Sequence, residues 1–128
     1  MLLAEDNELN REIATEILGM AGMEVVSAVN GQEAVERFIA DDGHYDLILM
    51  DVQMPVMDGY QATRMIRSSG HPRASEIPIL AMTADAFHED VVKAGEAGMN
   101  GHLAKPIDPD RLYRAITEAL EPPAKEAE

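Results

Sequence analysis

The sequence predicts an α/β fold with a doubly wound, five-stranded parallel sheet, and three observations support this prediction. Short apolar runs alternate five times with segments whose apolar residues recur at helical spacing. The run 47–50 is apolar throughout and turn residues follow it, which favours a central strand covered on both faces. Parallel strands need long crossover connections, and the intervening segments have the period expected of helices.

Each predicted strand is a short run that ends where polar or turn residues begin. The five predicted strands are residues 1–4, 24–28, 47–50, 77–82 and 101–104. Right-handed crossovers leave few topologies, and one common solution orders the strands 2-1-3-4-5, the flavodoxin-like (βα)5 arrangement. In that order the first and third strands are neighbours, so their carboxyl ends meet at the crevice where open α/β sheets bind ligands.

The predicted helices have recognisable starts. Side chains suited to cap a helix are Asn7 or Asn10 for the first helix, Asn30 for the second, Asp58 for the third and Asp108 for the fifth. The fourth helix is expected to open at 84–86. In the first helix, which should stop at Gly22, the apolar residues at helical spacing are Leu9, Ile13, Ile17 and Leu18.

Length, charge and composition narrow the classes of protein. The 128 residues suit one domain, expected over 1–121, with an acidic, proline-containing linker or tail over 122–128. The net charge of −14 argues against direct nucleic-acid binding, which needs clustered basic residues. The absence of cysteine excludes disulfides, thiolate metal sites and a cysteine nucleophile. Since no apolar run approaches the roughly 20 residues of a membrane helix, we expect a cytoplasmic chain without membrane contact.

Polar residues follow four of the predicted strands at their carboxyl ends. Asp51 follows the third strand and the acids Glu5 and Asp6 follow the first, so these three carboxylates should converge at the crevice. Thr83 and Lys105, at the ends of the fourth and fifth strands, should line the same edge. Taken alone, Asp51 also fits a solvated acid that starts a loop.

Three carboxylates in one crevice repel one another, and each close pair costs on the order of a few kcal/mol. Lys105 supplies one offsetting charge, and a hard divalent cation would supply two; Mg²⁺ suits oxygen ligands, with Mn²⁺ as the alternative ion. An acid cluster, a cation, a lysine and a hydroxyl together indicate phosphoryl chemistry. In such a site Asp51 can be the nucleophile, while Lys105 neutralises charge and Thr83 donates to a phosphoryl oxygen.

Four separated motifs, in this order, resemble the receiver domain of two-component response regulators over roughly residues 2–120. These motifs are Glu5-Asp6, Asp51 with the segment 54–59 behind it, Thr83-Ala84, and Lys105-Pro106. The resemblance implies that Asp51 accepts a phosphoryl group from a phosphohistidine and that Thr83 and Lys105 bind the phosphate.

The same resemblance implies a magnesium site and a cis peptide bond before a proline. Glu5, Asp6 and Asp51 would hold Mg²⁺ together with the backbone carbonyl of Gln53, and the bond before Pro106 would be cis. Binding of the new phosphate would then shift the face formed by the fourth helix, fifth strand and fifth helix.

Segments 6–11, 49–55 and 98–106 are most similar to receivers attached to hybrid sensor histidine kinases. This similarity implies two partners: the phosphohistidine domain of a histidine kinase, or a histidine phosphotransfer protein. A monomer or weak dimer is expected, and a stand-alone response regulator is the alternative origin.

Three further positions are candidates for a switch or for control of phosphate lifetime. Where many receivers carry Tyr or Phe, this chain has His102, which is either a bystander or a switch with a pH-dependent charge. In receivers, the positions of Gln53 and Asp85 flank the path of the attacking water, so both would tune dephosphorylation; Asp85 also fits a helix cap.

Two other classes of protein fit these residues less well than a receiver. A phosphatase of the haloacid dehalogenase type needs a second Asp two residues after the nucleophile, where this chain has Gln53. An interaction module whose acids only bind a cation would not need Thr83 and Lys105. As an enzyme, a receiver catalyses only its own phosphorylation and dephosphorylation, although a parent chain could be a histidine kinase.

Overall fold

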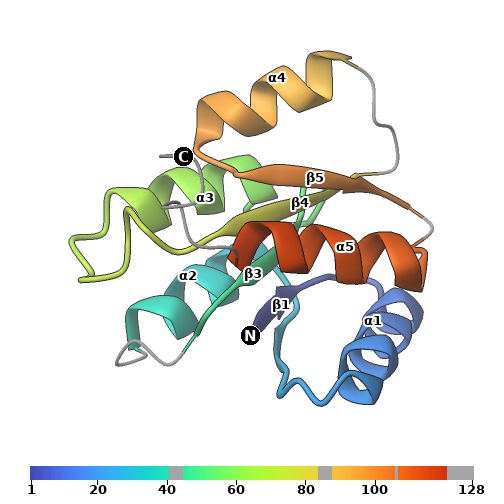
Figure 1. Cartoon of the computed structure of the whole chain (residues 1–128). Helices are drawn as coiled ribbons and strands as arrows, with labels where there is room; N and C mark the ends of the chain where they lie inside the picture. The colour runs from blue at the N-terminus through green and yellow to red at the C-terminus, as the bar shows by residue number, and fades with distance from the viewer. Residues whose placement is uncertain (41–44, 84–87, 106, 121–128) are drawn as a thin grey trace, which may run out of the picture.

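The computed structural model describes residues 1–40, 45–83, 88–105 and 107–120. Strands and helices alternate along the chain (Figure 1). The strands are β1 (Leu2–Ala4), β2 (Val26–Ala28), β3 (Ile48–Asp51), β4 (Ile79–Thr83) and β5 (Gly101–Ala104). The helices are α1 (Glu8–Met20), α2 (Gly31–Ala40), α3 (Gly59–Arg67), α4 (His88–Ala97) and α5 (Pro109–Leu120). Within the described ranges, no helix is both long enough and apolar enough to cross a membrane.

The five strands form one parallel sheet in the order β2-β1-β3-β4-β5, which confirms the predicted fold class and strand order. Ala4 lies opposite Met50, and Asp51 lies opposite Met82. Thr83, the last residue of β4, lies opposite Ala104, the last residue of β5. This register brings the carboxyl ends of β1, β3, β4 and β5 to one edge of the sheet.

Helices cover both faces of the sheet, because side chains alternate between the faces along each strand. Leu2 and Ile48 pack with buried residues of α2, α3 and α4 in one cluster. Leu3 and Leu49 pack with buried residues of α1 and α5 in a second cluster. Figure 1 shows the same division, with α1 and α5 on one side of the sheet and the other three helices beyond it.

Side-chain caps begin several helices as the sequence predicts. The Asn7 side chain, and not that of Asn10, caps α1, because its Oδ1 accepts from the Asn10 backbone N–H at 3.0 Å. Asn30 accepts from the N–H of Glu33 at 2.7 Å at the start of α2. Asp58 caps α3 by accepting from the Gln61 N–H at 2.9 Å. These caps satisfy N–H groups that have no partner within the helix.

Several expectations about the elements differ from the structure. The second strand begins at Val26 and not at residue 24. The start of the fourth helix expected at 84–86 lies outside the described residues. The fourth strand begins at Ile79 and not at residue 77, because Pro78 has no N–H to donate and serves only as an acceptor, for Ile48 N–H at 2.9 Å. The apolar residues of α1 do not all face the core: Leu9 is 64% exposed and Ile13 is 41% exposed. The buried face of α1 is formed instead by Ala14 and Leu18.

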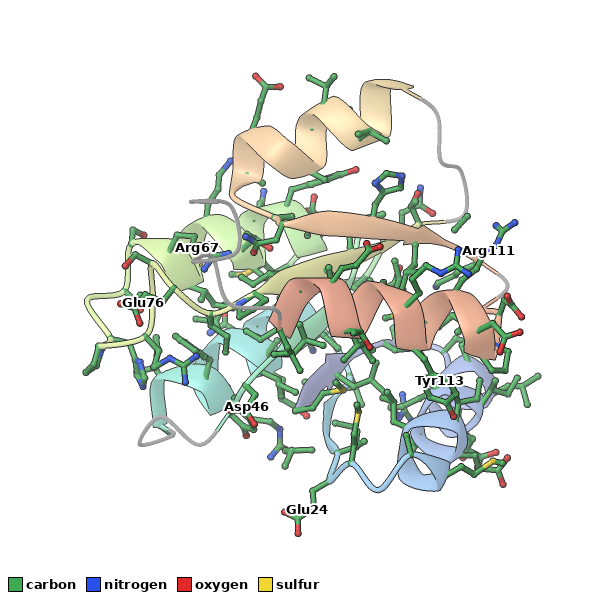
Figure 2. The ribbon with its side chains drawn as sticks, viewed as in Figure 1. Glu24, Asp46, Arg67, Glu76, Arg111 and Tyr113 are labelled. Atoms are coloured by element: carbon green, nitrogen blue, oxygen red, sulfur yellow. The ribbon has the colours of Figure 1, made fainter. Side chains whose placement is uncertain are left out.

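Arg67 joins the last turn of α3 to the segments that precede β4 and β5 (Figure 2). Its guanidinium donates five hydrogen bonds of 2.7–3.0 Å; the acceptors are the carbonyls of Ala74, Ile77 and Gly98 and the Asn100 side chain. The Asn100 Oδ1 atom also accepts from the Ile79 N–H at 2.8 Å, where β4 begins. Arg67 therefore fixes the amino-terminal ends of β4 and β5, away from the carboxyl-end edge.

Thr63, on the buried side of α3, gives a test of the packing. Its Oγ1 atom is buried and has no hydrogen-bond partner among the described residues. An unpaired buried hydroxyl is unfavourable, so Thr63→Val should raise the free energy of unfolding by about 1 kcal/mol in a urea titration. Thr117→Val is the matched control, since the exposed Thr117 hydroxyl donates to the Tyr113 carbonyl at 2.8 Å. A Thr63→Val variant that is no more stable than the parent chain would contradict the expectation.

Candidate functional site

The loop after β1 presents two acids at the carboxyl edge of the sheet. Glu5 is only 1% exposed, and its backbone N–H donates to the Ala28 carbonyl at 3.0 Å, which continues the pairing of β1 with β2. Its Oε2 atom accepts from the Asn7 N–H at 3.0 Å. Asp6, the next residue, is exposed. Glu5 is therefore buried at this edge and held by hydrogen bonds, while Asp6 is exposed to solvent.

Asp51 ends β3 at the same edge and is 2% exposed. The Lys105 ammonium lies 3.1 Å from Asp51 Oδ2 and 2.9 Å from Glu5 Oε1, so one lysine bridges both buried acids. The other oxygen of Asp51 accepts from the Gln53 N–H at 3.3 Å. The lysine side chain is 22% exposed, which leaves it open to an arriving group.

The three acids lie close enough to share one ion. Glu5, Asp6 and Asp51 each offer a carboxylate oxygen, and these atoms lie within 4.8 Å of one another. All three donors are hard oxygen ligands, the kind that Mg²⁺ and Ca²⁺ prefer. Lys105 pairs with two of these acids, so its single positive charge faces three carboxylates. The donor set and its excess negative charge therefore fit a hard divalent cation.

The Asp51 carboxyl is strongly perturbed. The pKa of Asp51 is raised from 3.8 to about 7, mainly by burial and next by the negative charge of Glu5, against the opposing effect of Lys105. Burial disfavours the charged form of Lys105, but hydrogen bonds and charges from Glu5 and Asp51 outweigh burial and raise the pKa of Lys105. Lys105 is therefore held as a cation, and further positive charge near Asp51 would favour its ionised form and lower its pKa.

The loop from β3 to α3 approaches Asp51 through close backbone contacts. A Cβ atom on Gly59 would lie 2.3 Å from the Asp51 carbonyl oxygen, and one on Gly31 would lie 2.3 Å from the Met57 carbonyl oxygen. Val56 has a φ of 69°, and the Met57 N–H donates to the Pro55 carbonyl at 2.7 Å. This is a γ-turn with a strained central residue, and such strain is concentrated at functional loops.

Thr83 and Lys105 lie next to each other at the carboxyl ends of β4 and β5. Thr83 is buried at the end of β4, and its carbonyl accepts from the Lys105 N–H at 2.8 Å. The pairing of β4 with β5 thus continues one residue past Ala104 and places the lysine next to Thr83. Their positions at one edge follow from the strand register.

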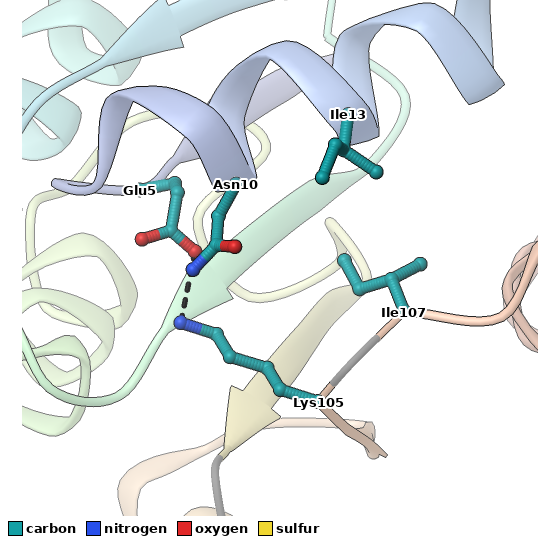
Figure 3. A pocket seen from close by; sticks show the side chains of 5 residues that line it. All are labelled: Glu5, Asn10, Ile13, Lys105 and Ile107. Carbon is teal, nitrogen blue, oxygen red and sulfur yellow. Dashed lines mark ion pairs between the residues drawn. The ribbon is translucent and has the colours of Figure 1, made fainter.

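A small pocket of about 120 Å³ lies against Lys105 on the side of α1. It is lined by Glu5, Asn10, Ile13, Lys105 and Ile107. Figure 3 shows the ion pair between Lys105 and Glu5, with Ile13 and Ile107 on the flank of the pocket. The charged edge therefore adjoins an apolar surface that includes the exposed Ile13.

The remaining candidate positions differ in what the structure says of them. Gln53 is exposed beside Asp51, to which its N–H donates. His102 is exposed on β5, opposite Ala81. Asp85 and Pro106 lie outside the described residues, so the expectations of a tuning residue and of a cis peptide bond stay predictions.

Arg11 is a residue near the site that the sequence reasoning missed. Its Nη1 atom donates to the backbone carbonyls of Glu5 at 2.9 Å and of Asp6 at 3.4 Å. The only signal in the sequence is a basic residue about one helical turn after the Asn7 cap, and helix patterns do not predict contacts with a preceding loop.

Comparison with known proteins agrees with this geometry. Residues 1–117 match the model of the response regulator receiver domain family. The chain is 39% identical over 123 residues to the osmosensing histidine protein kinase SLN1 of Saccharomyces cerevisiae. It is 36% identical over 123 residues to hybrid signal transduction histidine kinase I of Dictyostelium discoideum. These matches cover 92% and 94% of this chain but only 10% and 7% of the two kinases.

A solved structure is similar over nearly its whole length. The receiver domain of sensor histidine kinase PA1611 from Pseudomonas aeruginosa aligns with a TM-score of 0.84 and 38% identity. The alignment covers 93% of this chain and 94% of that domain. That crystal structure has a magnesium ion coordinated in its active site cleft.

Proposed function

The chain belongs to the response regulator receiver domain family, and on this premise we propose that Asp51 is the acceptor of a phosphoryl group from a phosphohistidine. One observation carries the proposal: the buried Asp51 carboxylate lies at the carboxyl edge of the sheet, 3.1 Å from the Lys105 ammonium and beside two further acids. In the transfer, the phosphorus–nitrogen bond of the donor breaks as an Asp51 oxygen bonds to phosphorus. The donor nitrogen keeps the electron pair.

The other residues of the edge have supporting roles in this proposal. Glu5, Asp6 and Asp51 would hold Mg²⁺, or Mn²⁺ in its place, with the Gln53 carbonyl. When bound, the ion supplies positive charge that offsets the acid cluster and the phosphoryl oxygens. Lys105 neutralises a phosphoryl oxygen, because its ammonium already lies at the Asp51 carboxylate.

Thr83 would donate to the new phosphate, since it ends β4 beside Lys105. Binding of the phosphate by these two residues then favours one of two arrangements of the face formed by α4, β5 and α5. In this proposal His102 belongs to that face, as it is exposed on β5. Gln53 and Asp85 would tune the rate at which water removes the phosphate.

We further propose that the chain is the receiver part of a hybrid sensor histidine kinase in the cytoplasm. The support is its similarity to short segments of two histidine kinases. The partners would be the kinase's phosphohistidine domain or a histidine phosphotransfer protein, and the domain itself would span 1–121 as a monomer or weak dimer. The apolar pocket beside Lys105 offers a donor protein a surface next to the acceptor.

The test is intact-mass analysis after incubation with acetyl phosphate and Mg²⁺. The expected result is one added, labile phosphate on the parent chain, and none on Asp51→Asn or after addition of a chelator. A phosphohistidine protein is the second donor, used if acetyl phosphate does not phosphorylate the chain. If neither donor adds phosphate while Mg²⁺ still binds, the chain is an interaction module and the proposal is wrong.

A further inference from the structure

We infer that Arg11 is a positioning residue of the acid cluster, which holds the backbone of Glu5 and Asp6 where their side chains can bind a divalent cation. The inference rests on the metal site of the proposed function. It concerns a residue that touches neither the phosphoryl group nor the ion in that proposal. Its basis is the pair of hydrogen bonds from Arg11 Nη1 to the Glu5 and Asp6 carbonyls, at 2.9 and 3.4 Å.

The loop between β1 and α1 is restrained on both sides of these carbonyls. Before them, the Glu5 N–H donates to Ala28, and so joins the loop to β2. After them, the Asn7 N–H donates to the Glu5 carboxylate and the Asn7 side chain caps α1. Between these two restraints, the carbonyls of Glu5 and Asp6 accept from Arg11, which gives the partly buried Glu5 carbonyl the partner that it requires.

Arg11 is well placed to hold this loop because its own backbone is fixed in α1. Its N–H donates to the Asn7 carbonyl at 2.9 Å, in the first turn of the helix. The side chain is half-buried and reaches back over that turn. Without this contact, repulsion between the two loop acids and Asp51 would favour a loop in which the acids move apart.

Positioning and charge predict opposite effects on metal affinity, and this difference makes the inference testable. If Arg11 acted only as a nearby positive charge, its removal would tighten the binding of a divalent cation. If it holds the loop, its removal weakens binding, as happens when an outer residue that orients a ligand is lost. Lysine keeps the charge but lacks the planar fork of arginine, so it should restore only part of the affinity.

The experiment is isothermal titration of Mg²⁺ into the unphosphorylated chain at about 0.15 M salt, where long-range charge effects are largely screened. We expect Arg11→Ala to weaken Mg²⁺ binding about 10-fold, and Arg11→Lys to weaken it by a smaller factor. Arg64→Ala is the matched control: it removes an exposed arginine from α3, in the layer opposite α1, and should leave the affinity unchanged. Far-ultraviolet circular dichroism checks that each variant is folded. If Arg11→Ala does not fold, the affinity of Arg11→Lys for Mg²⁺ tests the inference in its place.

A second readout separates positioning from a general loss of structure. In Arg11→Ala, the Mg²⁺ concentration that gives half of the maximal rate of phosphorylation by acetyl phosphate should be about 10-fold higher than in the parent. At saturating Mg²⁺ the two rates should be equal. Unchanged or tighter Mg²⁺ binding by Arg11→Ala would overturn the inference and leave the role of Asp51 standing. Failure of the parent chain to bind Mg²⁺ would overturn both the inference and the metal site.

Discussion

Asp51→Asn is expected to raise the free energy of unfolding of the metal-free chain by about 2 kcal/mol at pH 8. The reason is that Asp51 is buried beside Glu5, and its pKa is raised from 3.8 to about 7. Above pH 7 the parent chain must therefore hold an unfavourable charge that asparagine lacks. Lys105 keeps its ion pair with Glu5 in the variant, so no cation is left without a partner.

The pH dependence of this effect has a definite sign. Between about pH 4 and pH 7, folded Asp51 holds a proton that the unfolded chain has released, so Asp51 makes the parent less stable as the pH rises. The gain from Asp51→Asn should be near zero at pH 4, grow across this interval and level off above pH 7. Urea unfolding at several pH values in the presence of a chelator measures it.

Asp46→Asn is the control for the loss of one acid, because Asp46 is exposed before β3, at the opposite end of that strand from Asp51 (Figure 2).

Mg²⁺ should reduce or reverse the gain in stability of Asp51→Asn over the parent, since an ion that binds only the folded parent stabilises it. A variant no more stable than the parent at pH 8 would show that the edge does not destabilise the Asp51 charge.

Gly59→Ala is expected to lower the free energy of unfolding by about 3 kcal/mol. The new Cβ atom would lie 2.3 Å from the Asp51 carbonyl oxygen and 2.9 Å from the Val52 Cα atom. Both are backbone atoms, so no side chain can rotate away, and the start of α3 must shift from β3. Because that shift acts on the Asp51 backbone, the rate of phosphorylation should fall as well.

Gly19→Ala is the matched control for this prediction. Gly19 lies in α1, and a Cβ atom there would meet nothing within 4 Å, so alanine should stabilise the chain by up to about 1 kcal/mol through its helix propensity. Urea unfolding compares the two variants directly. Equal effects of the two substitutions would contradict the close approach of α3 to Asp51.

The sequence was sufficient to predict the sheet and the meeting of its polar residues. Strand order and the carboxyl ends of parallel strands follow from local pattern and handedness, so Asp51 and Lys105 could be placed at one edge from residue positions alone. The pairing of Lys105 with both Glu5 and Asp51 then follows from opposite charges in a confined space.

Other features depend on tertiary packing and could not be predicted. Helical spacing groups Leu9 and Ile13 with Leu18, but only the fit of α1 against the sheet decides that Leu18 is buried and Leu9 is not. Arg11 and Arg67 contact backbone carbonyls whose positions are set by the complete fold. The positive φ of Val56 opposes the preference of a β-branched residue, and no local rule indicates it.

The most direct test of the central claim identifies the phosphorylated atom by trapping. Sodium borohydride reduces an aspartyl phosphate to homoserine, and peptide mass spectrometry then locates the altered residue. After phosphorylation with Mg²⁺ and acetyl phosphate or a phosphohistidine protein, we predict homoserine at position 51 and an unaltered chain in the chelator control. Reduction at another acid, or phosphate that resists borohydride and remains on a histidine or hydroxyl side chain, would contradict the role proposed for Asp51.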